Sequence, residues 1–123
     1  MTQKKILLID DSQLEIQYLT EILNKENYSI SVCTDPTLAV EKATEILPDL
    51  ILLDIIMPQT DGYKTIRKLK SQESTKNIPV IFVSSKNLDF DKFWGKKQGA
   101  SEYVTKPINQ DQLLNAIKKV LIT

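Results

Sequence analysis

The chain has 123 residues, a length typical of one domain with an ordinary hydrophobic core. Its 16 basic and 16 acidic residues cancel, which argues against a nucleic-acid-binding surface and a polybasic membrane anchor. One cysteine, Cys33, and no histidine exclude an intramolecular disulfide, a Cys/His metal cluster and a catalytic histidine. Without a signal-peptide pattern or a membrane-spanning apolar run, we expect a cytoplasmic domain.

Short apolar runs alternate with helical patterns along the whole chain. Runs of this kind, apolar without alternation, are typical of strands that are covered on both faces. The first helix shows a capping-box pattern, Ser12 with Glu15 three residues later, and Asp35 before Pro36 indicates the start of the second. Taken in chain order, the expected strands are 6–9, 30–32, 50–53, 80–83 and 103–104, and a helix follows each of them.

This order, strand then helix five times, predicts an α/β fold with a five-stranded, doubly wound parallel sheet and five helices. The chain contains no linker, low-complexity tract or internal repeat. We therefore expect a single domain over residues 1–123.

Polar residues gather where the expected strands end. The first strand ends in Asp10 and Asp11, the third in Asp54, the fourth in Ser84, and Lys106 follows the fifth. Ligands of such sheets bind at the carboxyl ends of the strands, so these side chains should meet at one edge. Each of them alone could be a helix cap or an ordinary loop residue, and only their joint occurrence indicates a site.

Three neighbouring carboxylates repel one another by about 4 kcal/mol per pair at 4 Å and an effective dielectric of about 20. A lysine and a divalent cation could offset this repulsion, and an all-oxygen ligand set suits Mg²⁺. An aspartate can also act as a nucleophile and form an acyl phosphate. Asp54 is the better candidate because it stands alone on its strand, with Lys106 and Ser84 available to hold the transferred phosphoryl group.

The pattern "ILLIDDS…LILLDIIMPQTDGY…PVIFVSS…EYVTKPI" resembles the receiver domains of two-component response regulators, which have the CheY-like fold. The resemblance covers residues 4–121. It implies the flavodoxin-like strand order 2-1-3-4-5, one receiver domain over 1–123 with no output domain, and a sensor histidine kinase or phosphotransfer protein as phosphoryl donor.

The resemblance also assigns roles around the expected phosphoryl acceptor, Asp54. It implies that Mg²⁺ is held by Asp10, Asp11, Asp54 and the backbone carbonyl of Ile56. It implies further that Ser84 is the hydroxyl residue that moves toward the phosphoryl group, where the family often has threonine.

Three further features of the fifth strand follow from the same resemblance. Lys106 would bind the phosphoryl group, the bond between Lys106 and Pro107 would be cis, and Tyr103 would be the aromatic switch residue. The residues two positions beyond Asp54 and Ser84 affect hydrolysis of the phosphoryl group; here they are Ile56 and Lys86. Neither orients a water as a base, so our hypothesis is a long-lived phosphorylated state.

The family signals by protein binding, and we expect the fourth helix, fifth strand and fifth helix to bind a downstream protein target. The segment "LDFDKFWGKKQGA" on the expected fourth helix holds Phe90, Phe93 and Trp94. These aromatic residues could face the core; alternatively one of them, Trp94 above all, is exposed and acts as a docking anchor. The segment "FWGKKQGA" also resembles the corresponding segment of single-domain receivers of bacterial twitching motility and phototaxis.

Three classes of function remain open. The first is a phosphorylation-switched binding module, in direct signalling or a phosphorelay, which is itself modified and is therefore not an enzyme in the usual sense. The second is a Mg²⁺-dependent phosphatase with an aspartate nucleophile, although the chain lacks a cap insertion. The third is a degenerate receiver that serves as a constitutive scaffold.

Overall fold

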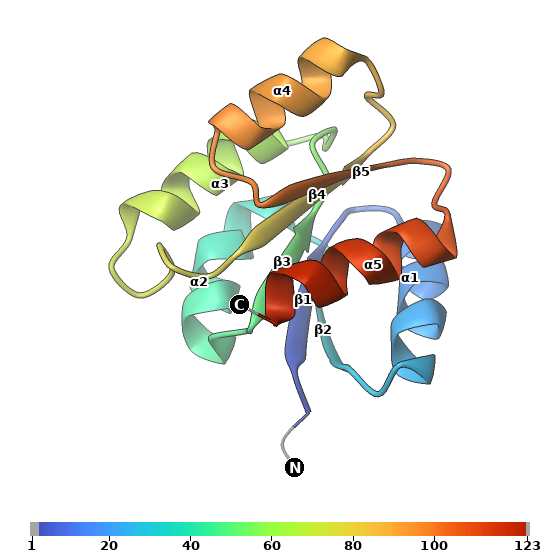
Figure 1. Cartoon of the computed structure of the whole chain (residues 1–123). Helices are drawn as coiled ribbons and strands as arrows, with labels where there is room; N and C mark the ends of the chain where they lie inside the picture. The colour runs from blue at the N-terminus through green and yellow to red at the C-terminus, as the bar shows by residue number, and fades with distance from the viewer. Residues whose placement is uncertain (1–2, 123) are drawn as a thin grey trace.

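The structure is a computed structural model, and it describes residues 3–122. Five strands form one parallel sheet in the order β2-β1-β3-β4-β5 (Figure 1). The five parallel strands and their order were predicted, and both are confirmed. The strands are β1 (Lys5–Ile9), β2 (Ser29–Cys33), β3 (Leu50–Leu53), β4 (Val80–Ser84) and β5 (Glu102–Thr105).

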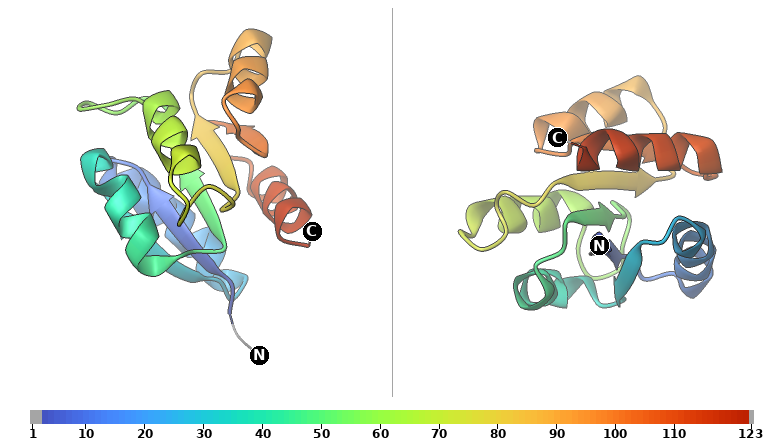
Figure 2. Two further views of the ribbon diagram at one scale, coloured as in Figure 1. Left: turned by 90° about the vertical axis from the view of Figure 1, so that its left-hand side faces the viewer. Right: turned by 60° about the horizontal axis from the view of Figure 1, so that its bottom comes forward.

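Helices cover both faces of this sheet, as the two views of Figure 2 show. A short 3-10 helix, η1, precedes the second α-helix, and its first residue follows the capping residue Asp35 as expected. None of the helices within residues 3–122 combines the length and apolar character needed to cross a bilayer. The helices are α1 (Gln13–Lys25), η1 (Pro36–Leu38), α2 (Ala39–Ile46), α3 (Gly62–Ser71), α4 (Asp89–Lys97) and α5 (Gln110–Leu121).

Two hydrophobic cores lie on opposite faces of the sheet because side chains along a strand alternate between its faces. In β1, Leu7 and Ile9 pack in the core that contains residues of α2 and α3. Ile6 and Leu8 pack in the other core, which contains residues of α1 and α5. Every residue of β3 is buried, which explains why its sequence is apolar without alternation.

The register of the sheet brings the polar strand ends together. Ile9 of β1 pairs with Leu53 of β3, so the residues that follow them, Asp10 and Asp54, leave the sheet side by side. Because β4 and β5 also pair in parallel, the residues after their last pair emerge at the same edge. The fold therefore creates one polar site from four separate segments.

One detail of the first helix differs from our prediction. Ser12 Oγ accepts a hydrogen bond from the Glu15 backbone N–H at 3.3 Å, as a capping residue should. The Ser12 backbone N–H, however, donates to Asp10 Oδ1 at 2.9 Å instead of to Glu15. The capping box is therefore only half formed, because Asp10 supplies a nearer acceptor and the Glu15 carboxylate lies toward Lys106 instead.

Candidate functional site

Three carboxylates form the centre of the site. Asp10 and Asp54 are 4% and 8% exposed, whereas Asp11 is exposed to solvent. Each of the three offers one oxygen atom, and these oxygens all lie within 4.8 Å of one another. Like charges at this separation repel strongly when they are shielded from water, so the cluster needs cations.

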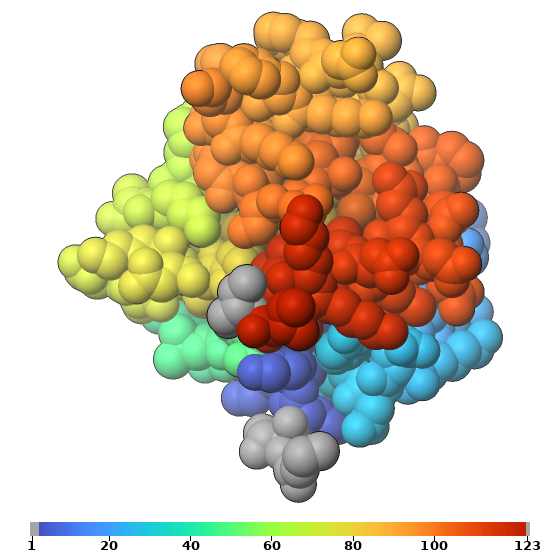
Figure 3. Space-filling view, viewed as in Figure 1, coloured from blue at the N-terminus to red at the C-terminus, as the bar shows by residue number. Residues whose placement is uncertain are grey.

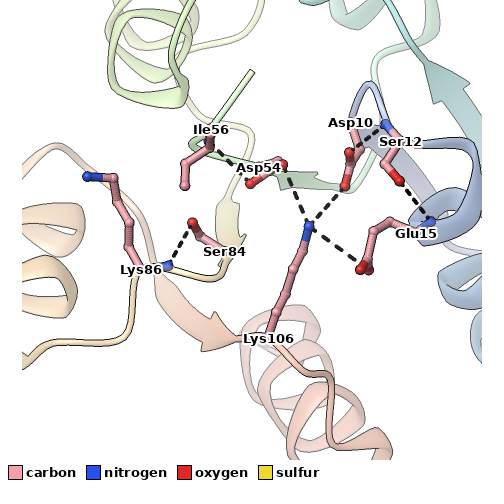
Figure 4. Close-up of polar contacts among 8 residues, drawn as sticks. All are labelled: Asp10, Ser12, Glu15, Asp54, Ile56, Ser84, Lys86 and Lys106. Carbon is pink, nitrogen blue, oxygen red and sulfur yellow. Dashed lines mark hydrogen bonds and ion pairs between the residues drawn. The ribbon is translucent and has the colours of Figure 1, made fainter. Parts of the chain in front are cut away.

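Lys106 reaches into this cluster from the end of β5 (Figure 4). Its Nζ lies 3.4 Å from Asp10 Oδ2 and 3.6 Å from Asp54 Oδ2. Glu15 Oε2 lies at 4.0 Å from the same nitrogen, which adds a fourth carboxylate to the site. The bond between Lys106 and Pro107 is cis, as the resemblance implied. A single ammonium group thus faces three carboxylates of three different segments.

Burial raises the pKa of the Asp54 carboxyl above its ordinary value. The Lys106 ammonium opposes this effect and lowers the pKa, while the neighbouring Asp10 raises it. Because burial has the largest effect, the ionised form of Asp54 carries a free-energy cost in the folded protein. Asp54 is therefore a carboxylate that would gain from an added cation.

The donor set fits a hard divalent cation. Mg²⁺ prefers oxygen ligands, often uses one or two carboxylates, and keeps several waters. Asp10, Asp11 and Asp54 would hold it, with the backbone carbonyl of Ile56 as a further oxygen ligand. The open side of the site at Asp11 leaves room for such waters, so the residues present are compatible with the implied metal.

Ser84 ends β4 beside the carboxylates, and it is completely buried. Its Oγ accepts a hydrogen bond from the backbone N–H of Lys86 at 3.3 Å. The Lys86 side chain points away from the carboxylates (Figure 4). Ile56 is 53% exposed at the mouth of the site, and its backbone N–H donates to Asp54 Oδ1 at 3.3 Å. Ile56 therefore presents an aliphatic side chain at the mouth of the site, and the Lys86 ammonium is turned away from the carboxylates.

Tyr103 is a buried residue of β5 that pairs with Phe82 of β4 and lies against α4. Its hydroxyl donates to the backbone carbonyl of Lys86 at 2.7 Å, and burial raises its pKa to about 12. The ring makes an edge contact with Phe82, with 6.0 Å between centroids. Gly95 of α4 lies against the same ring. Tyr103 therefore contacts the helix and, through its hydroxyl, the loop that precedes it.

The aromatic residues of α4 face outward. Phe90 is 68% exposed, Phe93 60% and Trp94 41%, so the interpretation of Phe90 and Phe93 as core residues is wrong. The reason is that Gly95 is the buried residue of α4, which places the larger side chains on the outer flanks of the helix. Exposure of Trp94, the alternative expectation, is confirmed.

Two residues of the site were missed by sequence reasoning. Glu15 lies four positions after Asp11, a spacing that puts both near the start of one helix and could have indicated a shared site. Gly95 had no comparable signal, because its contact with Tyr103 depends on how closely α4 approaches the sheet.

Comparisons with known proteins agree with this geometry. The family model of the response regulator receiver domain matches residues 6–118. Protein PilH of Pseudomonas aeruginosa is 39% identical over 117 residues, which cover 95% of this chain and 97% of PilH. The chain is also 35% identical to response regulator PleD of Caulobacter vibrioides over 94% of its own length, but that match covers only 26% of PleD.

Among solved structures, the chemotaxis response regulator CheY4 of Vibrio cholerae superimposes with a TM-score of 0.89 at 28% identity. The superposition covers 98% of this chain and 100% of CheY4. The similarity to PilH supports the narrower resemblance to receivers of twitching motility. The match to the family model over residues 6–118 agrees with the parallel sheet and the acidic cluster, and the chain belongs to the family of response regulator receiver domains.

Proposed function

We propose that this receiver domain is a switch that is set by phosphorylation of Asp54. The donor is a phosphohistidine on a sensor kinase or phosphotransfer protein. An Asp54 carboxylate oxygen attacks phosphorus, the P–N bond breaks, and the imidazole keeps the bonding electrons and takes up a proton. The observation that carries this proposal is the position of Asp54, buried beside Asp10 and 3.6 Å from the Lys106 ammonium.

The neighbouring residues have separate tasks in this scheme. Asp10, Asp11, Asp54 and the backbone carbonyl of Ile56 would hold Mg²⁺, which when bound would neutralise negative charge on the phosphoryl oxygens. Lys106 moves from its carboxylate partners toward the phosphoryl group and pairs with one of its oxygens. The Ser84 hydroxyl donates a hydrogen bond to another oxygen. Each of these groups favours the phosphorylated form without itself reacting.

The signal passes from Ser84 to the surface through the backbone of Lys86. Ser84 Oγ accepts from the Lys86 N–H, and the Tyr103 hydroxyl donates to the Lys86 carbonyl, so both side chains hold one peptide segment. A phosphoryl group that attracts Ser84 changes the conformation of this segment. It thereby shifts the equilibrium between two positions of α4. The altered face of α4, β5 and α5 then binds a downstream protein target.

The test is the intact mass of the protein after incubation with phosphoramidate, with and without Mg²⁺, for the wild type and Asp54→Asn. We expect one phosphoryl adduct that requires Mg²⁺ and is absent from the variant. An adduct of equal yield in Asp54→Asn would refute the assignment of the acceptor. Multiple turnovers of a small phosphate ester would instead support a phosphatase, and partner binding that ignores phosphorylation would support a scaffold.

A further inference from the structure

The neutral net charge of the chain conceals a strong separation of charge. Up to and including Asp61 there are four basic and eleven acidic residues, whereas from Gly62 onward there are twelve basic and five acidic residues. The sheet order places β2 and β1 toward one edge and β4 and β5 toward the other. The C-terminal half, with α3, α4 and α5, is therefore the basic side. The argument from net charge against a basic surface does not hold locally.

Within residues 3–122, six exposed cations on α3 and α4 form no ion pair with an acidic side chain. Among the described residues, none of these side chains has a carboxylate within 4.0 Å, whereas lysines elsewhere, such as Lys76 and Lys118, do form ion pairs. Unpaired surface cations attract negatively charged partners from solution. The six cations are Lys64, Arg67, Lys68, Lys92, Lys96 and Lys97.

Aromatic side chains lie among these cations. The rings of Phe90 and Trp94 stack with 6.4 Å between centroids and an angle of 5° between their planes. Lys97 Nζ lies 5.4 Å from the centroid of the Phe93 ring. Figure 3 shows α4, in orange, projecting at the top of the molecule, above α3 at the left. Aromatic residues exposed together on one element commonly mark a binding surface.

The stacked pair lies on the flank of α4 that faces α3. Residues four apart share one side of a helix, so Phe90, Trp94 and Gln98 form one row. Gln98 Oε1 accepts a hydrogen bond from Arg67 Nη1 of α3 at 2.9 Å, which orients this row toward α3. The row of Lys92 and Lys96 lies on the opposite flank. Phe90 and Trp94 thus lie on the side of α4 toward α3, away from the flank that carries Lys92 and Lys96.

We propose that a surface made by Arg67 of α3 and by Phe90, Phe93, Trp94 and Lys97 of α4 docks an acidic amphipathic segment of a partner protein. We call it the α3–α4 surface. An apolar side chain of the partner would pack on the stacked rings, and flanking carboxylates would pair with Arg67 and Lys97. This inference rests on the proposed function, because it names the chemistry of the target and a second side of α4 that contacts it.

The test uses Trp94 itself, since it is the only tryptophan of the chain. The probe is a capped 18-residue helical peptide with leucine at positions i, i+3, i+4 and i+7 and glutamate at most others. We expect saturable blue-shifted emission, with affinity that falls at least tenfold between about 50 and 500 mM NaCl. A peptide with lysine in place of glutamate should leave the emission unchanged.

Matched variants locate the contact on one flank of α4. Arg67→Glu should weaken binding at least fivefold, whereas Lys92→Glu, with the same charge change on the other flank, should change it less than twofold. Phe90→Ala should weaken binding about 30-fold, the loss expected for an anchor residue. All three side chains are exposed, so these variants should fold. Equal losses for Arg67→Glu and Lys92→Glu would overturn the assignment to the α3 side.

Other occupants give different results. If a single-stranded oligothymidine binds more tightly than the acidic peptide, the proposal that the surface binds a protein is wrong. If the protein forms salt-sensitive dimers in sedimentation equilibrium without peptide, the surface binds a second copy of this chain instead. The titration is repeated with Mg²⁺ and beryllofluoride, a phosphoryl mimic. Absence of binding in both states overturns this inference, whereas absence of the phosphoryl adduct in the mass measurement overturns the proposed function alone.

Discussion

Replacement of Gly95 by alanine tests whether α4 packs closely against the ring of Tyr103. A Cβ at this position would lie 2.8 Å from Tyr103 Cδ2 and 3.0 Å from Cε2 of the same ring. It would also lie 3.1 Å from Cδ2 of Phe82. Ordinary van der Waals contacts begin at 3.4 Å, so the ring or the helix must move by about 0.6 Å.

We expect the change in the free energy of unfolding to have the opposite sign to that of an ordinary Gly→Ala replacement in a helix. Alanine is favoured over glycine by about 1 kcal/mol in a helix interior. An additional methyl group in a packed region costs about 1–3 kcal/mol, and the Tyr103 ring cannot retreat freely because Phe82 lies against it. We therefore expect Gly95→Ala to lower the free energy of unfolding by about 1 kcal/mol.

Urea unfolding followed by circular dichroism at 222 nm measures this effect without relying on the emission of the neighbouring Trp94. The control is the same substitution in a Tyr103→Val background, which removes both ring atoms that the new Cβ would meet. There Gly95→Ala should lose most of its cost, with a coupling energy of about 1 kcal/mol between the two sites. Stabilisation of the wild-type background by Gly95→Ala would refute the close contact.

Three further predictions concern the site. Asp54→Asn should raise the free energy of unfolding at pH 7 without Mg²⁺ by on the order of 1 kcal/mol, because burial raises the pKa of Asp54 and makes its charge costly. In urea unfolding this gain should vanish below about pH 3.9, where the unfolded aspartate is also protonated, and a gain independent of pH would contradict the reasoning. Tyr103, with its pKa of about 12, should lose its stabilising effect as the pH rises from about 10 to 12; in absorbance at 295 nm, the last tyrosine to titrate should be missing in Tyr103→Phe. Ile56→Asn should accelerate loss of the phosphoryl group about tenfold in a mass time course, because an amide can orient a water, with Lys86→Ala as a control that should change the rate little.

Much of the fold follows from local sequence patterns. Short apolar runs located each end of every strand to within one residue, and β3 was predicted with its observed bounds. The ends of β5 extend to Glu102 and Thr105, beyond the apolar pair in its centre, because pairing with β4 depends on backbone hydrogen bonds and not on side-chain polarity. Alternation of strands and helices was enough to predict the parallel sheet.

The site was predictable in its members but only partly in its contacts. Asp10, Asp54 and Lys106 converge because parallel strands end at the same edge, which depends on topology alone. The partner of Glu15 was misassigned, since a capping box is a local pattern and cannot reveal a lysine ninety-one positions later in the chain. Contacts between residues so far apart in the sequence form only when the strands pair in the sheet.

The sequence by itself determined the strands, the order of elements, the three clustered carboxylates and the lysine that meets them. Only the tertiary structure decided that Gly95 faces Tyr103 and that Phe90 and Trp94 point outward beside α3. A helical pattern indicates which residues share a side, but which side is buried depends on the neighbouring elements. In α4 the smallest residue made the closest approach to the sheet, and the aromatic residues remained at the surface.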